Sequence, residues 1–152
     1  MKIKKILCPV DFSESCNLAV KYAKELALLF NSKLHLLHVV EHLHGDEHYM
    51  ILQITPQEIA EKVKRESEER LINIAKKMKK APKIKTEVRE GRAFVEIIKT
   101  ARKDNIDLII MGSHGRTGLP HVLIGSVAER VVRKAHCPVL IVKDKDTKFE
   151  MP

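Results

Sequence analysis

The chain has 152 residues, of which 44% are hydrophobic and 32% charged, and its formal net charge is +8. This length suits one globular domain that buries roughly 70% of the surface of its unfolded chain. No apolar run reaches the ~18 residues that a membrane-spanning helix needs, and no leader pattern precedes the first strand-like run. We therefore expect a cytoplasmic protein that does not bind membranes.

The positive charge by itself does not predict dedicated nucleic-acid binding. Many lysines lie between residues 62 and 85, where glutamates are mixed among them, as is typical of a solvated helix face. Two Tyr, four Phe and no Trp leave few side chains for stacking on bases. We expect weak attraction to polyanions at low salt and no dedicated nucleic-acid site.

No metal site is predicted from cysteine or histidine spacing. Cys8, Cys16 and Cys137 lack ligand spacing and are interpreted as small buried hydrophobes, with a redox role for Cys8 as the alternative. Residues 41–48 contain three histidines among acidic residues, and imidazole with carboxylate suits transition metals. Their spacing matches no structural zinc pattern, so a solvated polar loop is the preferred interpretation.

The first half of the chain predicts two strands and two helices. Residues 3–10 form an apolar run, and Ser13 is placed to cap a helix that ends at Asn31. Residues 33–40 are largely apolar, which is typical of a central parallel strand. After a polar connection, Thr55 opens a capping-box pattern, and the helix that it starts ends at Ala81 and Pro82. One face of this helix carries Ile59, Val63, Leu71, Ile74 and Met78.

The second half continues the alternation. Residues 84–90 alternate apolar and polar side chains, which predicts a half-exposed strand near the sheet edge. A shorter helix follows Gly91 and ends near Asn105, and residues 106–111 form the fourth strand. A glycine-containing loop then leads to a helix over residues 127–135 and a fifth strand over residues 138–142. This pattern predicts a parallel α/β sheet in one domain over residues 1–145, followed by a polar tail over residues 146–152.

The loop after the fourth strand carries the spacing G-x2-G-x9-G-S, formed by Gly112, Gly115, Gly125 and Ser126. Glycines between a strand end and a helix start let backbone N–H groups approach an anion closely. Ser126 is expected to cap the helix or to donate its hydroxyl to a phosphate oxygen. A single glycine there would indicate only a turn, but three at these offsets favour a phosphate cradle. The loop matches neither the Walker A nor the G-x-G-x-x-G pattern.

This spacing, together with the phrases MGSHGR at residues 111–116 and GSVAER at residues 125–130, resembles the nucleotide-binding branch of the universal stress protein family. The opening ILCPVDFS at residues 6–13 is similar as well, and the resemblance covers nearly the whole chain. It implies a Rossmann-like, adenine nucleotide alpha hydrolase-like fold: a single five-stranded parallel sheet in the order 3-2-1-4-5 with helices on both faces. That order reverses between strands one and four, where open parallel sheets bind ligands.

The resemblance also implies a set of residues that bind ATP, with Mg²⁺ or Mn²⁺ accompanying the phosphates. Asp11 would bind a ribose hydroxyl or assist a metal ion, although an aspartate there also suits a turn. Val39 would meet the adenine edge through its backbone. Alanine stands at position 128, where the family often has a hydroxyl residue, so only the backbone donor is expected there. The implied nucleotide-binding residues are Pro9, Val10, Asp11, Val39, Met111, Gly112, His114, Gly115, Arg116, Gly125, Ser126, Val127 and Ala128.

No nucleophile–base pair or residue suited to activating water is evident, so no catalytic residue is assigned. We expect an ATP-binding stress-response or regulatory switch with at most slow ATP hydrolysis. The alternative is a nucleotide-independent homodimeric module that binds other proteins, and adenylyl transfer is a third option that the fold alone does not exclude. The apolar fifth strand, at a sheet edge in the implied order, predicts a homodimer that pairs through it.

Overall fold

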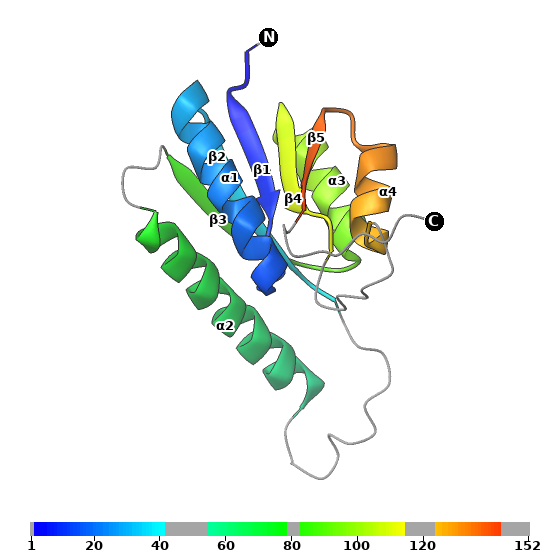
Figure 1. The fold of residues 1–152 in the computed structure, drawn as a ribbon. Coiled ribbons are helices and arrows are strands. Elements are labelled where there is room, and N and C mark those ends of the chain that lie inside the picture. The colour runs from blue at the N-terminus through cyan, green and yellow to red at the C-terminus, as the bar shows by residue number, and fades with distance from the viewer. Residues whose placement is uncertain (1, 42–54, 79–82, 115–123, 144–152) are drawn as a thin grey trace.

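Five parallel strands form a single sheet with helices on both of its faces (Figure 1). The structure is a computed structural model, and it describes residues 2–41, 55–78, 83–114 and 124–143. The strand order is β3-β2-β1-β4-β5, which confirms the expected order and fold class. The strands are β1 Lys5–Pro9, β2 Lys33–Val40, β3 Ile84–Glu90, β4 Leu108–Gly112 and β5 Val139–Val142.

The four helices of the described residues follow the predicted alternation. They are α1 Glu14–Phe30, α2 Pro56–Lys77, α3 Ala93–Lys103 and α4 Ser126–Lys134. The Ser13 hydroxyl accepts a hydrogen bond from the Cys16 N–H and caps α1, and Asn31 ends that helix in the left-handed conformation. Thr55 and Glu58 form the predicted capping box. Within the described ranges, no helix has the length and apolar character required to cross a bilayer.

Alternation of side chains along the central strands builds two separate cores. Ile6 and Cys8 of β1 face α1 and α2, whereas Leu7 faces α3 and α4. β1, β2 and β4 contribute to both cores. Because helices cover both faces of these strands, apolar residues stand at nearly every position along them. On α1, Ala19, Ala23 and Ala27 are all fully buried. These small side chains at four-residue spacing let the helix backbone lie close to the sheet.

Several predicted boundaries differ from the structure by one or two residues, as at both ends of β1, and two of the differences have a clear cause. The fourth strand begins at Leu108 rather than at residue 106, because Asn105 adopts a left-handed φ of 50° and the Ile106 N–H still bonds back to the Ala101 carbonyl. The helix expected over residues 127–135 begins at Ser126 with Gly125 as its N-cap, and no side chain caps it. The capping role considered for Ser126 is therefore wrong. The predicted end of α2 at Ala81 and Pro82 lies outside the described residues.

One aspartate joins the starts of the two central strands β1 and β4. The Asp107 Oδ2 accepts hydrogen bonds from the backbone N–H groups of Lys4, at 2.8 Å, and Lys5, at 2.9 Å. The Asp107 N–H in turn donates to the Lys5 carbonyl at 3.0 Å. These contacts join segments about one hundred residues apart in sequence, so they stabilise pairing that local structure cannot.

We predict that Asp107→Ala lowers the free energy of unfolding by about 1–3 kcal/mol, because two backbone donors lose a charged acceptor. Asp107→Asn keeps one side-chain acceptor oxygen and should lose less. Urea unfolding followed by circular dichroism measures both changes. Equal stability of the wild type and Asp107→Ala would show that water replaces the carboxylate without cost.

Candidate functional site

A large cleft lies beyond the carboxyl ends of the strands, where the strand order reverses between β1 and β4. Its volume is about 1130 Å³ among the described residues. The loops after β1, β2 and β4, one face of α2, and the first turns of α3 and α4 line it. In an open parallel sheet, loops at the reversal diverge to opposite faces and leave such a space.

Most residues in the predicted set line this cleft, and two lie outside the described residues. Gly115 and Arg116 are those two. The residues that line the cleft are Pro9, Val10, Asp11, Val39, Met111, Gly112, His114, Gly125, Ser126, Val127 and Ala128. The structure therefore brings together residues from four separate segments of the chain, and their binding role stays a prediction.

Hydroxyl groups connect the loop after β1 with the loop after β4. The Ser13 hydroxyl donates to the Asp11 Oδ1 at 2.6 Å and lies 3.0 Å from the Ser15 hydroxyl. Ser15 donates to the His114 carbonyl at 3.2 Å. Asp11 also accepts from the Ser13 N–H, so one of its oxygens serves the turn that was the alternative interpretation. Its side chain still lines the cleft.

The first turn of α4 offers backbone donors to the cleft. The first intrahelical hydrogen bond runs from the Glu129 N–H to the Gly125 carbonyl at 3.0 Å. The N–H groups of Ser126, Val127 and Ala128 precede it and have no partner within the helix, which is the usual condition of a helix start. The Ala128 side chain is buried in the core, so only its backbone is available at this end.

Gly112 leaves little room for a side chain at the end of β4. A Cβ atom there would lie 3.2 Å from the His114 carbonyl oxygen and 3.6 Å from the Ser15 carbonyl oxygen. Next to it, Ser113 is buried, and its hydroxyl lies 2.9 Å from the His114 Nδ1. His114, expected in an exposed loop, is half-buried. This segment is held close to the first turn of α1.

A stack of three side chains was missed by the sequence interpretation. Phe12 adopts a left-handed φ of 64°, which is unusual for a bulky residue. Its ring lies 4.4 Å from the His38 ring, and the Arg70 guanidinium carbon lies 3.9 Å from its centroid. The His38 Nδ1 is 2.7 Å from the Val10 carbonyl oxygen. These two ring contacts hold the strained Phe12 backbone in place at the cleft wall.

The apolar residues of the α2 segment divide between the core and the wall of the cleft, although their helical spacing in the sequence is the same. Leu71 and Met78 are buried in the core, whereas Ile59 and Val63 line the cleft. At about 1.5 Å per residue, a helix of 22 residues is ~33 Å long, and a strand of seven residues spans only ~23 Å. The amino-terminal half of α2 therefore extends past the sheet.

The thiols near the cleft are protonated at neutral pH. Burial raises the pKa of the Cys16 thiol to about 12. Burial also raises the pKa of Cys8, which is fully buried in β1. A thiolate is the reactive form, so neither cysteine is suited to nucleophilic or redox chemistry, and both pack as small hydrophobes. Both findings favour the packing interpretation over the redox one.

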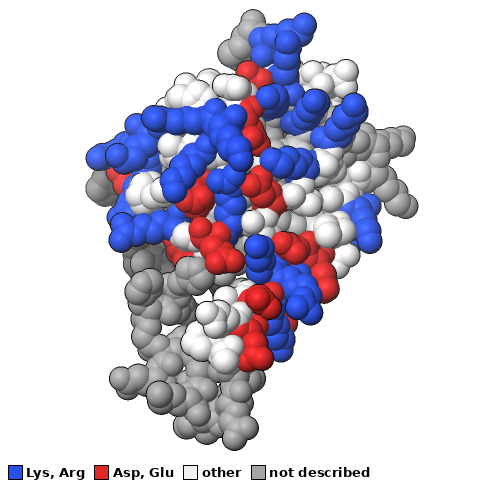
Figure 2. Space-filling model, turned by 180° about the vertical axis from the view of Figure 1, so that it is seen from behind, with Lys and Arg blue, Asp and Glu red and all other residues white. Residues whose placement is uncertain are grey.

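Basic side chains gather at the opposite, amino-terminal edge of the sheet, which we call the basic edge. Figure 2 shows Lys and Arg predominating in the upper part of the molecule, where the strands begin. Lysines stand at strand starts, and helices that run back from the cleft bring their last turns to this edge. The basic edge comprises Lys4, Lys5, Lys33, Lys76, Lys77, Lys83, Lys85, Arg102, Lys103, Arg133 and Lys134.

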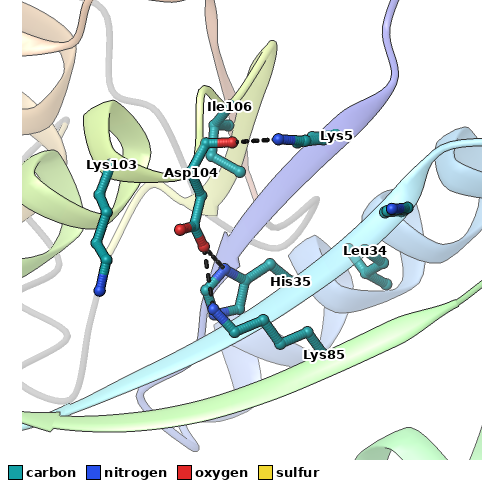
Figure 3. A pocket seen from close by; sticks show the side chains of 8 residues that line it. Lys5, Leu34, His35, Lys85, Lys103, Asp104 and Ile106 are labelled. Atoms are coloured by element: carbon teal, nitrogen blue, oxygen red, sulfur yellow. Dashed lines mark hydrogen bonds and ion pairs between the residues drawn. The ribbon is translucent and has the colours of Figure 1, made fainter.

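A second, smaller cavity opens in the basic edge (Figure 3). Its volume is about 270 Å³, and its lining includes Lys5, Lys33, Lys85 and Lys103. The Lys5 Nζ donates to the Asp104 backbone carbonyl at 2.6 Å. This cavity did not figure in the sequence interpretation, because its lysines are scattered over the chain and meet only in the fold.

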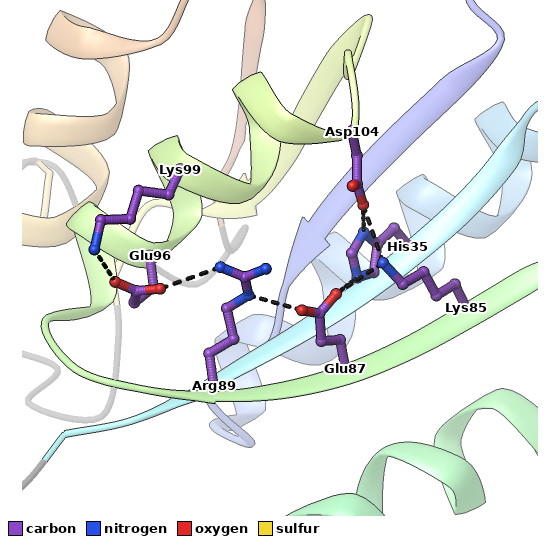
Figure 4. A network of polar contacts seen from close by, with 7 residues as sticks. All are labelled: His35, Lys85, Glu87, Arg89, Glu96, Lys99 and Asp104. Atoms are coloured by element: carbon purple, nitrogen blue, oxygen red, sulfur yellow. Dashed lines mark hydrogen bonds and ion pairs between the residues drawn. The ribbon is translucent and has the colours of Figure 1, made fainter.

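Next to this cavity, a charged network joins β2, β3 and the end of α3 (Figure 4). The Lys85 Nζ lies 2.8 Å from the Glu87 Oε2 and 3.1 Å from the Asp104 Oδ2. The buried His35 ring lies between the same carboxylates, with its nitrogens 3.0 Å from Glu87 and 3.2 Å from Asp104. Burial lowers the pKa of His35, and the Lys85 charge lowers it further. The Lys85 ammonium therefore supplies the positive charge here at neutral pH.

Glu87 makes the network sensitive to acid. Partial burial would raise the pKa of its carboxyl, but hydrogen bonds from Lys85 and Arg89 outweigh this and lower the pKa from 4.5 to about 2. A carboxyl group whose pKa falls on folding stabilises the folded protein when the pH is above the pKa of that group in the unfolded chain. This stabilisation is lost as the pH falls through the pKa of the group in the folded protein. The relevant window therefore runs from about pH 4.5 down to about pH 2.

We predict that Glu87→Gln destabilises the protein at pH 7 by on the order of 1 kcal/mol, and that this difference shrinks below pH 4.5. Urea unfolding of both proteins at pH 7 and pH 3 measures it. Glu68→Gln, on the exposed part of α2, is the control and should show little change at either pH. A difference that does not depend on pH would contradict the assigned contribution of the Glu87 charge.

Comparison with known proteins agrees with the fold and with the motif. The Universal stress protein family matches residues 2–143 of the chain. Universal stress protein MJ0577 of Methanocaldococcus jannaschii is 35% identical, over 95% of this chain and 97% of its own length. Universal stress protein MJ0531 of the same organism is 38% identical, over 92% of this chain and 82% of its own length.

Solved structures give the same result. The structure of MJ0577 superposes with a TM-score of 0.82 at 37% identity and covers 96% of this chain and 99% of its own. Universal stress protein UspA from Lactobacillus plantarum has a TM-score of 0.74 at 28% identity, covering 93% of this chain and 99% of its own. More distant family structures contain cAMP, at 24% identity, and dAMP, in the protein from Archaeoglobus fulgidus at 21% identity. The chain belongs to the universal stress protein family.

Proposed function

We propose that the protein binds ATP in the large cleft and acts as a nucleotide-dependent regulatory switch. The observation that carries this proposal is the arrangement of Gly112, Gly125 and the first turn of α4 around the reversal of the strand order. Partly positive N–H groups at a helix start favour anionic oxygens. A cleft of about 1130 Å³ is large enough for a nucleotide of this size.

Each part of the nucleotide has a suitable neighbour in the cleft. We assign the adenine to the backbone at Val39, at the end of β2, and the ribose to the Asp11 carboxylate. The phosphates belong at Gly125 and the N–H groups of the residues that follow it. Gly115 and Arg116 are proposed as further phosphate contacts from the loop outside the described residues. Nucleotides in more distant family members support the same class of ligand.

The residues also fit a divalent cation that travels with the phosphates. Mg²⁺ or Mn²⁺ takes oxygen ligands, most of which phosphate and water can supply. Asp11 is the carboxylate that follows β1 and lines the cleft, and one of its oxygens already accepts hydrogen bonds from Ser13. The cation would neutralise charge between the phosphates. No step beyond this is assigned to it.

The cleft favours binding over catalysis. Among the described lining residues, the Cys16 thiol is protonated, and Asp11 accepts hydrogen bonds within its own turn. We therefore propose at most slow hydrolysis, with ATP acting by stabilising the conformation or assembly that binds it best. The alternative, an interaction module that needs no nucleotide, predicts that the purified protein carries none.

We predict that wild-type protein binds Mg-ATP and that Gly125→Val weakens binding at least about tenfold, because a branched side chain would occupy the space of a phosphate oxygen. Gly125→Ala adds one carbon and should lose less. Isothermal titration calorimetry measures the affinities. Gly125 has ordinary backbone angles, with φ of −63°, so neither change strains the backbone itself.

Native circular dichroism spectra of both variants serve as the control for folding. Mass spectrometry of nucleotide released from gently purified protein gives an independent readout. Absence of heat and of any thermal shift with millimolar Mg-ATP would refute the proposal. Equal affinity of the wild type and Gly125→Val would show that Gly125 serves only the turn.

We also propose a homodimer that pairs through β5, which lies at the edge of the sheet. Leu140 is 36% exposed there, and Val139 and Ile141 are partly exposed, so the edge presents both apolar side chains and unpaired backbone groups. We predict twice the mass of one 17.4 kDa chain in light scattering at micromolar concentration. A monomer mass would favour coverage of this edge by the chain's own tail.

A further inference from the structure

The small cavity in the basic edge is built by the register of three strands. Lys5 of β1 pairs with Lys33 of β2, and His35 of β2 pairs with Lys85 of β3. Alternate residues of a strand share one face, and Leu7 and Leu37 place this set on the α3 side of the sheet. Lys103, the last residue of α3, completes the lining (Figure 3).

The local carboxylates pair with Lys85 or accept from backbone N–H groups, so they do not neutralise Lys5, Lys33 or Lys103. Asp104 is engaged by Lys85 and lies against His35, and Asp107 accepts from two backbone N–H groups. Lys5 bonds to a carbonyl, which carries no net charge. Within the part of the chain that the structure describes, Lys33 and Lys103 form no ion pair. The cavity therefore faces an excess of positive charge.

Helix termini account for only part of this excess. Cations in a last turn are favoured by the helix dipole, which explains Lys103. Lys5 and Lys33 begin β-strands, where no comparable dipole attracts a cation. Like charges brought together at a strand edge repel one another, and an anion between them would relieve that repulsion.

A divalent cation is not the ligand that this arrangement favours. His35, Glu87 and Asp104 could each offer a ligand atom within 4.8 Å of the others. The Lys85 ammonium, however, already lies at hydrogen-bond distance from both carboxylates. The other lysines of the cavity would repel a second cation. Lys85 thus takes the position that a metal ion would need.

We propose that this cavity binds a short chain of phosphate groups that carries no nucleoside. Lysine ammonium groups are compact point charges without the fixed fork of arginine, so they suit a flexible anion with many equivalent oxygens. A cavity of about 270 Å³ is much smaller than the cleft, and among the described residues no Phe, Tyr or Trp lines it for stacking on a base. The one ring in its lining, that of His35, is buried between two carboxylates. The chemistry therefore selects oligophosphate over nucleic acid.

The site is separate from the nucleotide cleft. The cavity lies at the strand starts and the cleft beyond the strand ends, and a strand of five residues such as β1 spans about 17 Å. Occupation of one site therefore does not block the other by contact. The proposal stands whether or not the large cleft binds ATP.

The probe is inorganic tripolyphosphate, titrated by calorimetry at low salt. Because tripolyphosphate resembles the tail of ATP, the titration uses the Gly125→Val background as well as the wild type. Lys33→Gln combined with Lys103→Gln should weaken binding about tenfold or more, since two phosphate contacts are lost. Lys62→Gln combined with Lys64→Gln removes the same charge from an exposed part of α2 and should change affinity less than about twofold.

Location is tested by amide chemical shifts. In the Gly125→Val background, tripolyphosphate should move the resonances of Lys33 and Asp104, and the Lys33/Lys103 double variant should keep its affinity for Mg-ATP and its native circular dichroism spectrum. Equal loss in both double variants would show attraction to net charge only and would overturn the proposal. Binding that disappears with Gly125→Val alone would assign the anion to the cleft and would overturn it as well.

Discussion

All five strands run in the same direction, and β1 lies at their centre, hydrogen-bonded to β2 on one side and β4 on the other. Every connecting helix must therefore begin near the carboxyl ends of the strands and run back to their amino ends. Helices therefore begin at the carboxyl ends of the strands, and helices end and strands begin at the basic edge. Asp107 holds β1 and β4 together at the amino edge, on the opposite side from the point where their following loops diverge.

Packing transmits this arrangement to the cleft. The small residues of α1 bring that helix close to the sheet, and the first turn of α1 then reaches the loop after β4 through Ser15 and His114. On the other side of the cleft, α2 extends past the sheet and presents Arg70 to Phe12. Contacts of the Phe12 ring with His38 and Arg70 offset the strain of its backbone.

Charged groups are also distributed differently at the two ends of the strands. The cleft receives backbone N–H groups from the first turn of α4, and dipoles that the fold holds in place suit an anion. The amino edge concentrates lysines from segments far apart in sequence, and its carboxylates are engaged by Lys85, His35 and backbone N–H groups. Among the described residues, Lys and Arg therefore gather at the strand starts, away from the large cleft.

Local patterns in the sequence determined the elements: period-two and period-3.6 spacing located all the strands and helices of the described residues, and Ser13, Asn31 and Thr55 marked helix ends correctly because caps act within a few residues. The glycine spacing placed Gly112 and Gly125 at a strand end and a helix start, and resemblance supplied the strand order. Only the tertiary structure decided the start of β4, the division of the α2 face between core and cleft, the stack on Phe12, and the meeting of Lys5, Lys33, Lys85 and Lys103. These features depend on distances between residues far apart in the chain, which strand register and helix length set and which no local pattern encodes.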